Sequence, residues 1–365
     1  MPFNGRQSTE AHFTDARLPG QHVQMPEGRV VITEQGGNEM RVMLTGGTGF
    51  LGGHVLKALV AAGHEPTALV RSEAKLEQVK GIHGLSGAAV GVVVGDILDA
   101  ASVAKAMEGA DACIHSAAFT TLDPAAQHKC VEVNAPGTRI VLDAAVAAGC
   151  DPIIHMSSMS CIFPPVGDLA DPYIDPVHST EAPYARSKAD SEHYARELQA
   201  AGRPVTIVYP AGVTGPDDAG FNVMSMVLTG VVGAEFLMSA PSGGWSLVDV
   251  RDLATAIAAM VAPGKGPRRY MAGGNTVDWA EFNRVITDVT GRERAVYPMT
   301  REQLLENLDE EAVDIMLGLK PSNEAPLRAD TGVRWRPIDE TVRDTVTWLM
   351  AHGHLDRAWA PALSR

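Results

Sequence analysis

Residues 45–52 read TGGTGFLG, a run rich in glycine that joins an apolar segment to an Ala- and Leu-rich one. Gly46, Gly49 and Gly52 are spaced three apart, and Gly47, Gly49 and Gly52 also have the spacing GxGxxG. The preceding RVMLT predicts a strand, and residues from about 50 to 62 predict a helix. Glycines in such a turn let the backbone approach a pyrophosphate at the helix N-terminus. The stretch predicts a dinucleotide-binding loop; the alternative is a glycine-rich turn without a ligand.

Beyond this loop, short apolar runs alternate with helical stretches as far as residue 214. We expect strands at RVMLTG, EPTALVR, AAVGVVVGD, ACIHSAA, PIIHMSS and PVTIVYPAGV, with a helix between each pair. The helix between the fourth and fifth strands is expected at GTRIVLDAAVAAGC, residues 137–150. Strands that are apolar on both sides and separated by helices indicate a parallel sheet covered on both faces. The fold class is therefore α/β, a Rossmann-type doubly wound parallel sheet whose ligands bind at the carboxyl ends of the strands.

The domain organisation follows from changes in this rhythm. Residues 1–39 are polar and weakly patterned and form an N-terminal extension, and residues 40–214 form the dinucleotide-binding domain. Residues 215–353 are expected to be mainly a smaller substrate-binding lobe with some segments returning to the sheet, and residues 354–365 a C-terminal tail.

Composition excludes several classes of function. The chain has 365 residues, 45% of them hydrophobic, and a formal net charge of -14, which disfavours nucleic acid and anionic membranes as partners. No apolar run is long enough to cross a bilayer, and no secretory signal is recognised, so we expect a cytoplasmic protein. The four cysteines lack metal-ligand spacing and predict buried thiols, and the scattered histidines predict packed neutral side chains and no metal.

The end of the second strand distinguishes the two nicotinamide cofactors. An NAD site has an acidic side chain there, whereas this chain has Val70 and Arg71. A guanidinium suits the 2′-phosphate of NADP, so NADP is favoured and NAD is the alternative. Asp96 and Ile97, after the third strand, could contact the adenine, although Asp96 could equally cap the next helix.

Two strand-end segments carry groups that could do chemistry. YARSK (residues 184–188) places Tyr184 and Lys188 on one face of a helix, and HMSSMS (residues 155–160) ends the fifth strand with serines. A tyrosine can exchange a proton with a substrate oxygen if a neighbouring ammonium favours the phenolate. A serine hydroxyl can polarise the substrate carbonyl. The alternative for Tyr184 and Lys188 is an exposed helix face.

Together these motifs resemble the extended short-chain dehydrogenase/reductase family, also described as the NAD-dependent epimerase/dehydratase family. The resemblance covers residues 40–353 and is carried by TGGTGFLG, GDILD, HSAA, VNAPGTRIVLDAAVAAG, HMSSMS, PYARSKADSE, PAGVTGPDD and VDVRDLATAI. It implies catalytic roles for Ser158, with Ser157 and Ser160 as fallbacks, for Tyr184 and for Lys188. It implies a cofactor site formed by Gly46, Thr48, Gly49, Phe50, Leu51, Gly52, Arg71, Asp96, Ile97, Ala117, Ala118, Tyr184, Lys188, Pro210, Gly212 and Val213. Asn134 is similar to a family asparagine with a structural role.

The chain departs from the family pattern at CIF (residues 161–163), where VYG is common, and at Tyr209, where arginine is common. The missing acid after the second strand favours the branch of dihydroflavonol reductases and 3β-hydroxysteroid dehydrogenases. The family also makes a homodimer through helices near residues 138–148 and 186–201 an expectation.

The expected activity is hydride transfer between NADP and a hydrophobic ketone or secondary alcohol. A nucleotide-sugar epimerase or dehydratase with tightly bound NAD and a non-catalytic NADP-sensing protein are the alternatives. An apolar substrate wall could include Tyr209, Phe221, Met224, Met226, Phe236, Met238 and Trp245, although lobe packing is the better explanation for most of them.

Overall fold

Strand β1 (Arg41–Thr45) lies inside a seven-stranded parallel sheet, and the glycine turn follows it directly. The computed structural model describes residues 39–87, 90–162, 167–176, 182–306, 308 and 310–364. The predicted N-terminal extension lies outside these residues, apart from Glu39. Residues 38–365 form one compact unit, so the sheet and the C-terminal elements can be described together.

The main sheet has the strand order β10-β6-β5-β4-β1-β2-β3, and every neighbouring pair is parallel. Its other strands are β2 (Glu65–Val70), β3 (Gly91–Val94), β4 (Ala112–His115), β5 (Ile153–Met156), β6 (Val205–Pro210) and β10 (Arg268–Ala272). From β1 the chain proceeds to β2 and β3 on one side, and then to β4, β5 and β6 on the other. The point where the order reverses lies between β1 and β4, and doubly wound sheets bind ligands at this point. The predicted fold class is confirmed.

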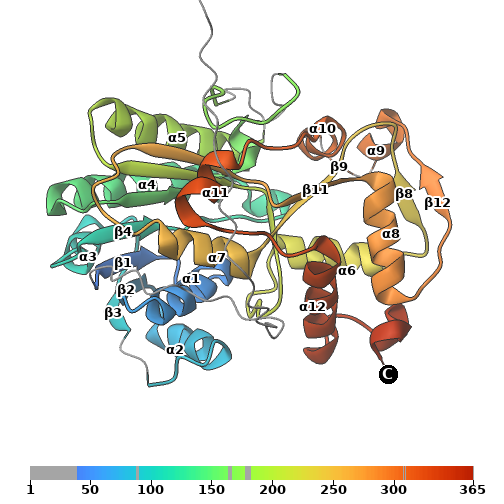
Figure 1. Cartoon of the computed structure of the whole chain (residues 1–365), viewed down its shortest axis with the longest axis horizontal. Coiled ribbons are helices and arrows are strands. Elements are labelled where there is room, and N and C mark those ends of the chain that lie inside the picture. Colours follow the sequence, from blue (N-terminus) through green and yellow to red (C-terminus); the bar gives the residue numbers. More distant parts are fainter. Residues whose placement is uncertain are drawn as a thin grey trace, which may run out of the picture. The chain divides into compact units, whose positions relative to one another are not determined.

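Helices cover both faces of this sheet (Figure 1). Side chains of β1 alternate between two core clusters, with Val42 and Leu44 in one and Met43 in the other. The first cluster packs under α1 (Phe50–Ala61), α2 (Glu73–Ile82), α7 (Val250–Ala259) and α11 (Ala325–Thr331). The second packs under α3 (Ala100–Ala106), α4 (His128–Ala148) and α5 (Pro183–Ala200). The sequence predicts six of the seven strands and their intervening helices.

Helix α4 begins well before its predicted start near residue 137. It starts at His128 and runs through Pro136, which lies inside the helix. A proline usually ends a helix because it has no N–H, and this is why the sequence pattern placed the boundary too late. The longer helix brings Gly137 against the loop after β3, where a Cβ atom on Gly137 would lie 2.5 Å from Ile97 Cδ1.

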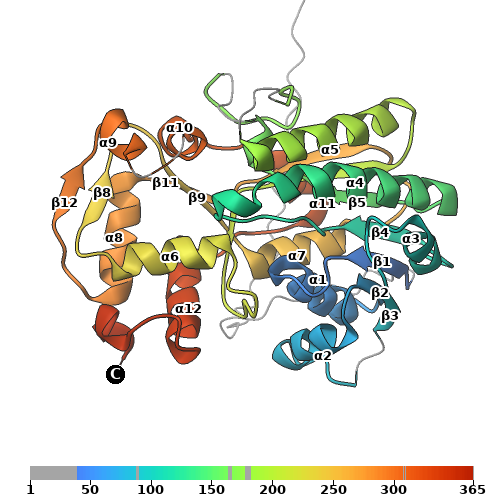
Figure 2. The same ribbon diagram turned by 180° about the vertical axis from the view of Figure 1, so that it is seen from behind.

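The remaining elements gather to one side of the main sheet (Figures 1 and 2). They include two small sheets, β11 (Asn275–Asp278) with β9 (Gly244–Asp249) and β7 (Gly212–Thr214), and β12 (Val296–Pro298) with β8 (Leu237–Ser239). Their helices are α6 (Val223–Gly233), α8 (Trp279–Thr290), α9 (Arg301–Leu305), α10 (Glu310–Gly318) and α12 (Ile338–Ala351). Short 3₁₀ turns are η1 (Pro124–Ala126), η2 (Met159–Ile162), η3 (Arg357–Trp359) and η4 (Pro361–Leu363).

A separate apolar cluster holds these elements together, with α6, α8 and α12 packed around Phe282 and Val342. The segment expected to be a C-terminal tail contributes Leu355 and Ala360 to it, and both are buried. Strand β10 returns from beyond residue 215 to pair with β6. The boundary between residues 214 and 215 stays a prediction.

Candidate active site

The turn after β1 has a geometry that only glycine tolerates at two points. Gly46 has φ of +80°, and a Cβ atom there would lie 2.8 Å from the nitrogen of Ala117. A Cβ atom on Gly52 would lie 2.0 Å from the Gly46 carbonyl oxygen. Gly49 is the N-cap of α1, and its N–H donates to Gly46 O at 2.8 Å. The N-terminus of α1 is therefore free of bulky side chains at these points, which fits a bound pyrophosphate.

The other residues expected in this loop differ in their surroundings. Thr48 and Phe50 are partly exposed, and the Phe50 ring lies edge-on against His54 with 5.6 Å between centroids. Leu51 is partly buried and packs against the first core cluster. Thr48 and Phe50 therefore have exposed atoms beside the turn, whereas Leu51 packs the first turn of α1 against the core.

A buried hydrogen-bond chain joins the ends of β1 and β4 to α4 and α5. The Thr45 hydroxyl accepts from the backbone N–H groups of Ser116 and Ala117 at 3.2 and 3.1 Å, and lies 2.8 Å from His115 Nδ1. Since that hydroxyl already accepts two bonds, we infer that it donates its proton to Nδ1. His115 Nε2 then donates to Thr138 Oγ1 at 3.0 Å. This chain fixes Ala117 beside Gly46, and Ala118 follows it on the exposed surface.

His115 and His155 have the surroundings predicted for packed neutral histidines. Burial, with the nearby Lys188 charge, lowers the pKa of His115 to about 3. Burial and the charges of His115 and Lys188 hold the pKa of His155 well below its usual value. The two rings stack with 5.7 Å between centroids. Both rings are therefore uncharged packing groups, buried near the carboxyl ends of β4 and β5.

The residues expected to contact the adenosine half lie at the ends of β2 and β3. Arg71 is exposed immediately after β2, next to Ser72, whose side chain caps α2. Asp96 and Ile97 follow β3 and are partly buried. Asp96 Oδ1 accepts from Leu98 N at 3.0 Å, and Asp99 caps α3. The helix-capping alternative for Asp96 is thus wrong, because Asp99 occupies the cap.

The three candidate serines differ in what their hydroxyls touch. Ser157 is buried, and its Oγ donates to Glu192 Oε2 at 2.6 Å. Ser158 is partly exposed, and its Oγ accepts from Ser160 Oγ at 2.9 Å. The Ser157 hydroxyl is therefore committed to the interior. Ser158 is the serine whose hydroxyl is partly accessible and supported by a second hydroxyl, which favours it over Ser157.

Tyr184 and Lys188 lie on the first two turns of α5, which begins at Pro183. Tyr184 is partly buried. The Lys188 side chain is buried, and its Nζ donates to the Met156 carbonyl at 2.9 Å. Met156 is the last residue of β5 and leads into the serine segment, so the lysine amine lies at the carboxyl end of the sheet, as predicted for a site there.

The start of α5 is held by Asn134 of α4. The Asn134 Oδ1 accepts from Phe119 N at 2.7 Å, and its Nδ2 donates to Phe119 O at 3.0 Å and to Ser187 Oγ at 2.9 Å. Ser187 Oγ donates to the Tyr184 carbonyl at 2.7 Å. Asn134 therefore connects the segment after β4 to the turn that carries Tyr184, in agreement with a structural role.

Burial lowers the pKa of Lys188 to about 8, and electrostatic interactions with Cys161 and Glu192 oppose this effect. At neutral pH the ammonium still predominates, since this pKa lies above 7. A protonated amine at this position can favour a nearby phenolate. The electrostatics of the site thus fit an acid–base role for a tyrosine on the same helix.

The segment expected beside the nicotinamide crosses from the main sheet into the second one. Pro210 ends β6 and is buried, and Gly212 and Val213 belong to β7, where they are partly exposed. A Cβ atom on Gly212 would lie 3.0 Å from Met224 Cε. The glycine therefore keeps this crossing clear beside α6.

The proposed apolar substrate wall is not one surface. Tyr209 is fully buried in the second core cluster and does not face a cleft, because its hydroxyl donates to Glu192. Phe221, Met224 and Trp245 pack against the cluster around α6, α8 and α12. Met226 and Phe236 are each 44% exposed. Lobe packing, the better explanation for most of these residues, is confirmed for Phe221, Met224 and Trp245.

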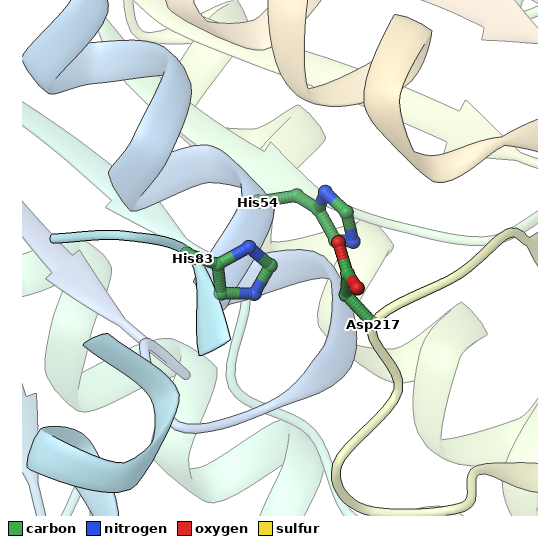
Figure 3. Close-up of side chains that lie close together, drawn as sticks. All are labelled: His54, His83 and Asp217. Carbon is green, nitrogen blue, oxygen red and sulfur yellow. The ribbon is translucent and has the colours of Figure 1, made fainter. Parts of the chain in front are cut away.

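The sequence did not reveal one group of potential metal ligands, His54, His83 and Asp217 (Figure 3). They come from α1, the end of α2 and the segment after β7, and their ligand atoms lie within 4.8 Å of one another. His54 Nε2, however, already bonds to the Pro216 carbonyl at 3.1 Å. Burial and the neighbouring His83 lower the pKa of His54 to about 3. This group joins α1 to the loop after β7 through a neutral histidine.

A hollow of about 890 Å³ lies away from all these residues, at the amino ends of β1 and β4. Its walls include Arg41, Asp111 and Gly149, and Arg41 and Asp111 are paired at 2.8 Å. Doubly wound sheets bind ligands at the opposite, carboxyl edge. We therefore place the candidate site at the glycine turn and not in this hollow.

The fold and the glycine turn define an extended short-chain dehydrogenase/reductase with a Rossmann-type sheet. Residues 42–273 match the model of the NAD dependent epimerase/dehydratase family, and the chain belongs to that family. Its members are enzymes that act on CH–OH or keto groups. Within the described residues, no helix combines the length and apolar character needed to cross a membrane.

Three known proteins illustrate the relationship. Sterol demethylase protein B of Methylococcus capsulatus is 28% identical over 70% of this chain and 76% of its own length. A putative dihydroflavonol 4-reductase of Synechocystis sp. is 25% identical over 86% of this chain and 95% of its own. The crystal structure of DesIV, a dTDP-glucose 4,6-dehydratase from Streptomyces venezuelae with NAD and TYD bound, has a TM-score of 0.67 and 24% identity, covering 89% of this chain and all of that one. At 24% identity, the similarity to DesIV shows a shared fold only.

Proposed function

We propose that this protein transfers hydride between NADP and a hydrophobic ketone or secondary alcohol. The observation that carries the proposal is the buried Lys188 amine at the Met156 carbonyl, which joins the Tyr184 helix to the strand leading into Ser158. Tyr184 is assigned as acid–base, Lys188 as the cation that favours its phenolate, and Ser158 as the donor to the substrate oxygen. These are the three functions that carbonyl reduction requires.

The nicotinamide, when bound, gives or takes the hydride at the substrate carbon. In reduction, Tyr184 passes its phenolic proton to the oxygen as the carbonyl becomes an alcohol, and in oxidation it takes that proton back. The ammonium of Lys188 stabilises the phenolate left behind. Ser158 Oγ donates to the substrate oxygen and itself accepts from Ser160 Oγ, which keeps its proton directed outward.

Cofactor binding is assigned to the turn and the strand ends around it. Gly46 and Gly52 leave room for the backbone to contact the pyrophosphate, and the α1 N-terminus favours its negative charge. Asp96 and Ile97, which follow β3 and are partly buried, are assigned to the adenine. Arg71, exposed directly after β2, supports a 2′-phosphate and hence NADP, because its guanidinium can form charge-assisted hydrogen bonds to it.

The preference for a hydrophobic substrate rests on charge and on the relatives. The segment of residues 221–242 contains no lysine or arginine, whereas a nucleotide diphosphate would need cationic partners. The relatives described above include a putative dihydroflavonol 4-reductase and a sterol demethylase protein. Both names refer to molecules with hydrophobic ring systems.

A nucleotide-sugar epimerase or dehydratase is the second candidate. The likeness to the dehydratase DesIV, whose structure contains NAD, favours it. It predicts that NAD stays bound through purification and that no NADPH is consumed. Native mass spectrometry of freshly purified protein separates the two candidates, because it reports the bound cofactor directly.

The central experiment compares Tyr184→Phe with Tyr297→Phe, a control tyrosine that is 54% exposed on β12. NADPH consumption is followed with a panel of hydrophobic ketones. We expect Tyr184→Phe to lose activity by on the order of a hundredfold or more and Tyr297→Phe to keep it. Equal rates for Tyr184→Phe and the parent would rule out the assigned chemistry.

Two finer expectations belong to the same proposal. A homodimer would form through α4 and α5, two long helices that pack side by side on one face of the sheet. A cytoplasmic location agrees with four buried cysteine thiols without disulfides. The native mass spectrum that identifies the cofactor also gives the number of subunits, and a monomer would exclude the dimer.

A further inference from the structure

Glu192 is a fully buried carboxylate one helical turn beyond Lys188 on α5. Tyr184, Lys188, Glu192 and Arg196 are spaced four residues apart, so they follow one another along the same face of the helix. A buried carboxylate is costly unless every oxygen is paired. Glu192 therefore shares a helix face with Tyr184 and Lys188, the two residues of α5 assigned to catalysis.

Both oxygens of Glu192 are engaged, and they serve different elements. Oε2 accepts from Ser157 Oγ at 2.6 Å and lies 3.1 Å from Cys161 Sγ, and both donors belong to the segment after β5. Oε1 accepts from Arg196 Nε at 2.7 Å and from the hydroxyl of Tyr209 on β6. One side chain thus links α5 to the serine segment and to the neighbouring strand.

The segment held in this way is the one that carries Ser158. Ser157, its chain neighbour, bonds directly to the carboxylate. The Cys161 thiol lies 2.9 Å from the Ser158 carbonyl, so its one proton can go to that oxygen or to Glu192. Two contacts therefore hold the backbone on either side of Ser158: the Ser157 hydroxyl bonds to Glu192, and the Cys161 thiol contacts the Ser158 carbonyl. Loss of the carboxylate would remove the contacts that hold this segment against α5.

The charge of Glu192 also acts on Lys188. The titratable groups that act on this amine or on which it acts are His115 on β4, His155 on β5, Cys161 on η2 and Glu192 on α5. Both histidines are neutral and the pKa of the Cys161 thiol is raised well above its usual value by burial, with Glu192 adding to the effect. Burial lowers the pKa of Lys188 to about 8, and the interaction with Glu192 acts against that lowering.

We propose that Glu192 is a positioning residue of the candidate active site: it ties the Ser158 segment to α5 and supplies the negative charge next to the Lys188 amine. This inference rests on the proposed function for its catalytic consequence. Its structural part, the coupling between Glu192 and Lys188, stands apart from turnover. Arg196 completes the arrangement, because it neutralises the far side of the carboxylate through a contact of 2.7 Å.

The test titrates Lys188 by NMR in protein labelled with ¹³C-lysine, with Lys188→Arg used to assign the resonance. Glu192→Gln keeps the shape of the side chain and removes its charge, whereas Glu197→Gln removes a charge from the exposed face of the same helix. We expect the Lys188 midpoint to fall in Glu192→Gln and to stay in place in Glu197→Gln. An unchanged midpoint in folded Glu192→Gln overturns the proposal.

The matching kinetic readout is the pH profile of ketone reduction with NADPH. At alkaline pH, kcat/KM should begin to fall at a lower pH in Glu192→Gln than in the parent or in Glu197→Gln. The reason is that the Lys188 ammonium of Glu192→Gln loses its proton at a lower pH. Because the NMR titration needs no turnover, absence of ketone reduction in the parent refutes the proposed function without touching the titration result.

Ser157→Ala is the second variant and decides the positioning role if Glu192→Gln does not fold. It removes one donor to Oε2 and leaves the charge in place. We expect kcat to fall on the order of tenfold to a hundredfold with an unchanged KM for NADPH, because only the serine segment is displaced. An unchanged kcat in folded Ser157→Ala overturns the positioning role.

Discussion

Asp249 and Thr341, which are 92 residues apart in the sequence, form a buried hydrogen bond of 2.9 Å from the threonine hydroxyl to Oδ2. Asp249 also caps α7 through Arg251 N at 2.9 Å and accepts from the Arg251 guanidinium at 2.9 and 2.7 Å. This carboxylate joins the end of β9 to α12.

Asp249→Asn should lower the free energy of unfolding by about 3 kcal/mol at neutral pH, because it removes the charge of a buried carboxylate and leaves the Arg251 guanidinium with Asp344 as its remaining partner. Urea denaturation measures this change. Asp339→Asn, at a carboxylate 53% exposed on α12, should change it by no more than about 0.5 kcal/mol. Equal effects of the two substitutions would contradict the importance of the buried contact.

The parent and Asp249→Asn also test how the stabilisation by Asp249 depends on pH. Burial alone raises the pKa of Asp249, but the hydrogen bonds and charge of Arg251 and the charge of Arg336 outweigh it, so the pKa lies below its usual value of 3.8. Its contribution is then complete above pH 3.8 and is lost as pH falls through the folded-state pKa. The difference between parent and Asp249→Asn should narrow in that acidic range.

Lys188 predicts a second gain in stability with rising pH, in alkaline solution. Its pKa falls from 10.5 when unfolded to about 8 when folded, chiefly because it is buried. Between these values the unfolded chain binds the extra proton, so the unfolding free energy of the parent should rise with pH relative to Lys188→Met. The full gain is about 3 kcal/mol and is absent below pH 8. Denaturation at neutral pH and near pH 10 measures it; a constant difference would contradict the buried ammonium.

Gly52→Ala should disable the glycine turn. The added methyl group would meet the Gly46 carbonyl and force α1 away from β1, which costs about 1–3 kcal/mol. NADPH affinity, measured by fluorescence titration, should fall at least about tenfold, since the pyrophosphate site is built from this backbone. The matched control is Gly81→Ala on α2, where no atom lies within 4 Å of the new carbon and helix propensity favours alanine. Equal NADPH binding in the two variants would refute the assigned loop.

Arg71→Ser should change the choice of cofactor. Removal of the guanidinium takes away its charge-assisted bonds to a 2′-phosphate, so KM for NADPH should rise on the order of tenfold to a hundredfold while KM for NADH stays within about twofold. Arg284→Ala, at an exposed arginine of α8, serves as the control and should alter neither value. An equal loss with NADPH and NADH would show that Arg71 does not read the phosphate.

The sequence predicts the sheet well because its strands are apolar on both faces and its turns carry glycine. The glycine turn, the strand-end serines and the Tyr184 helix all come from short-range spacing, which a single sequence displays. The boundary of α4 is missed because Pro136 breaks the local rule while the longer helix is stabilised by packing. Tyr209 is assigned to the wrong surroundings because its partner, Glu192, comes from another element.

Long-range groupings could not be derived from spacing. His54, His83 and Asp217 come from three elements that only the fold brings together. Glu192 had a local signal, the repeat of Tyr184, Lys188 and Glu192 at intervals of four residues. That spacing could not identify Ser157 and Tyr209 as the hydrogen-bond partners of Glu192, because their positions depend on the pairing of β5 with β6.

The pairing of β10 with β6 limits how this chain can be divided. Every residue of β6 is buried, and β10 covers its outer side along five pairs of residues from Arg268 to Ala272. A recombinant fragment that stops at residue 214 would leave the backbone N–H and C=O groups on the outer side of this buried strand unpaired, and such edges associate with one another. Expression of the nucleotide-binding half by itself should yield aggregates, so biochemical work needs the chain through its last sheet strand and the helices that follow.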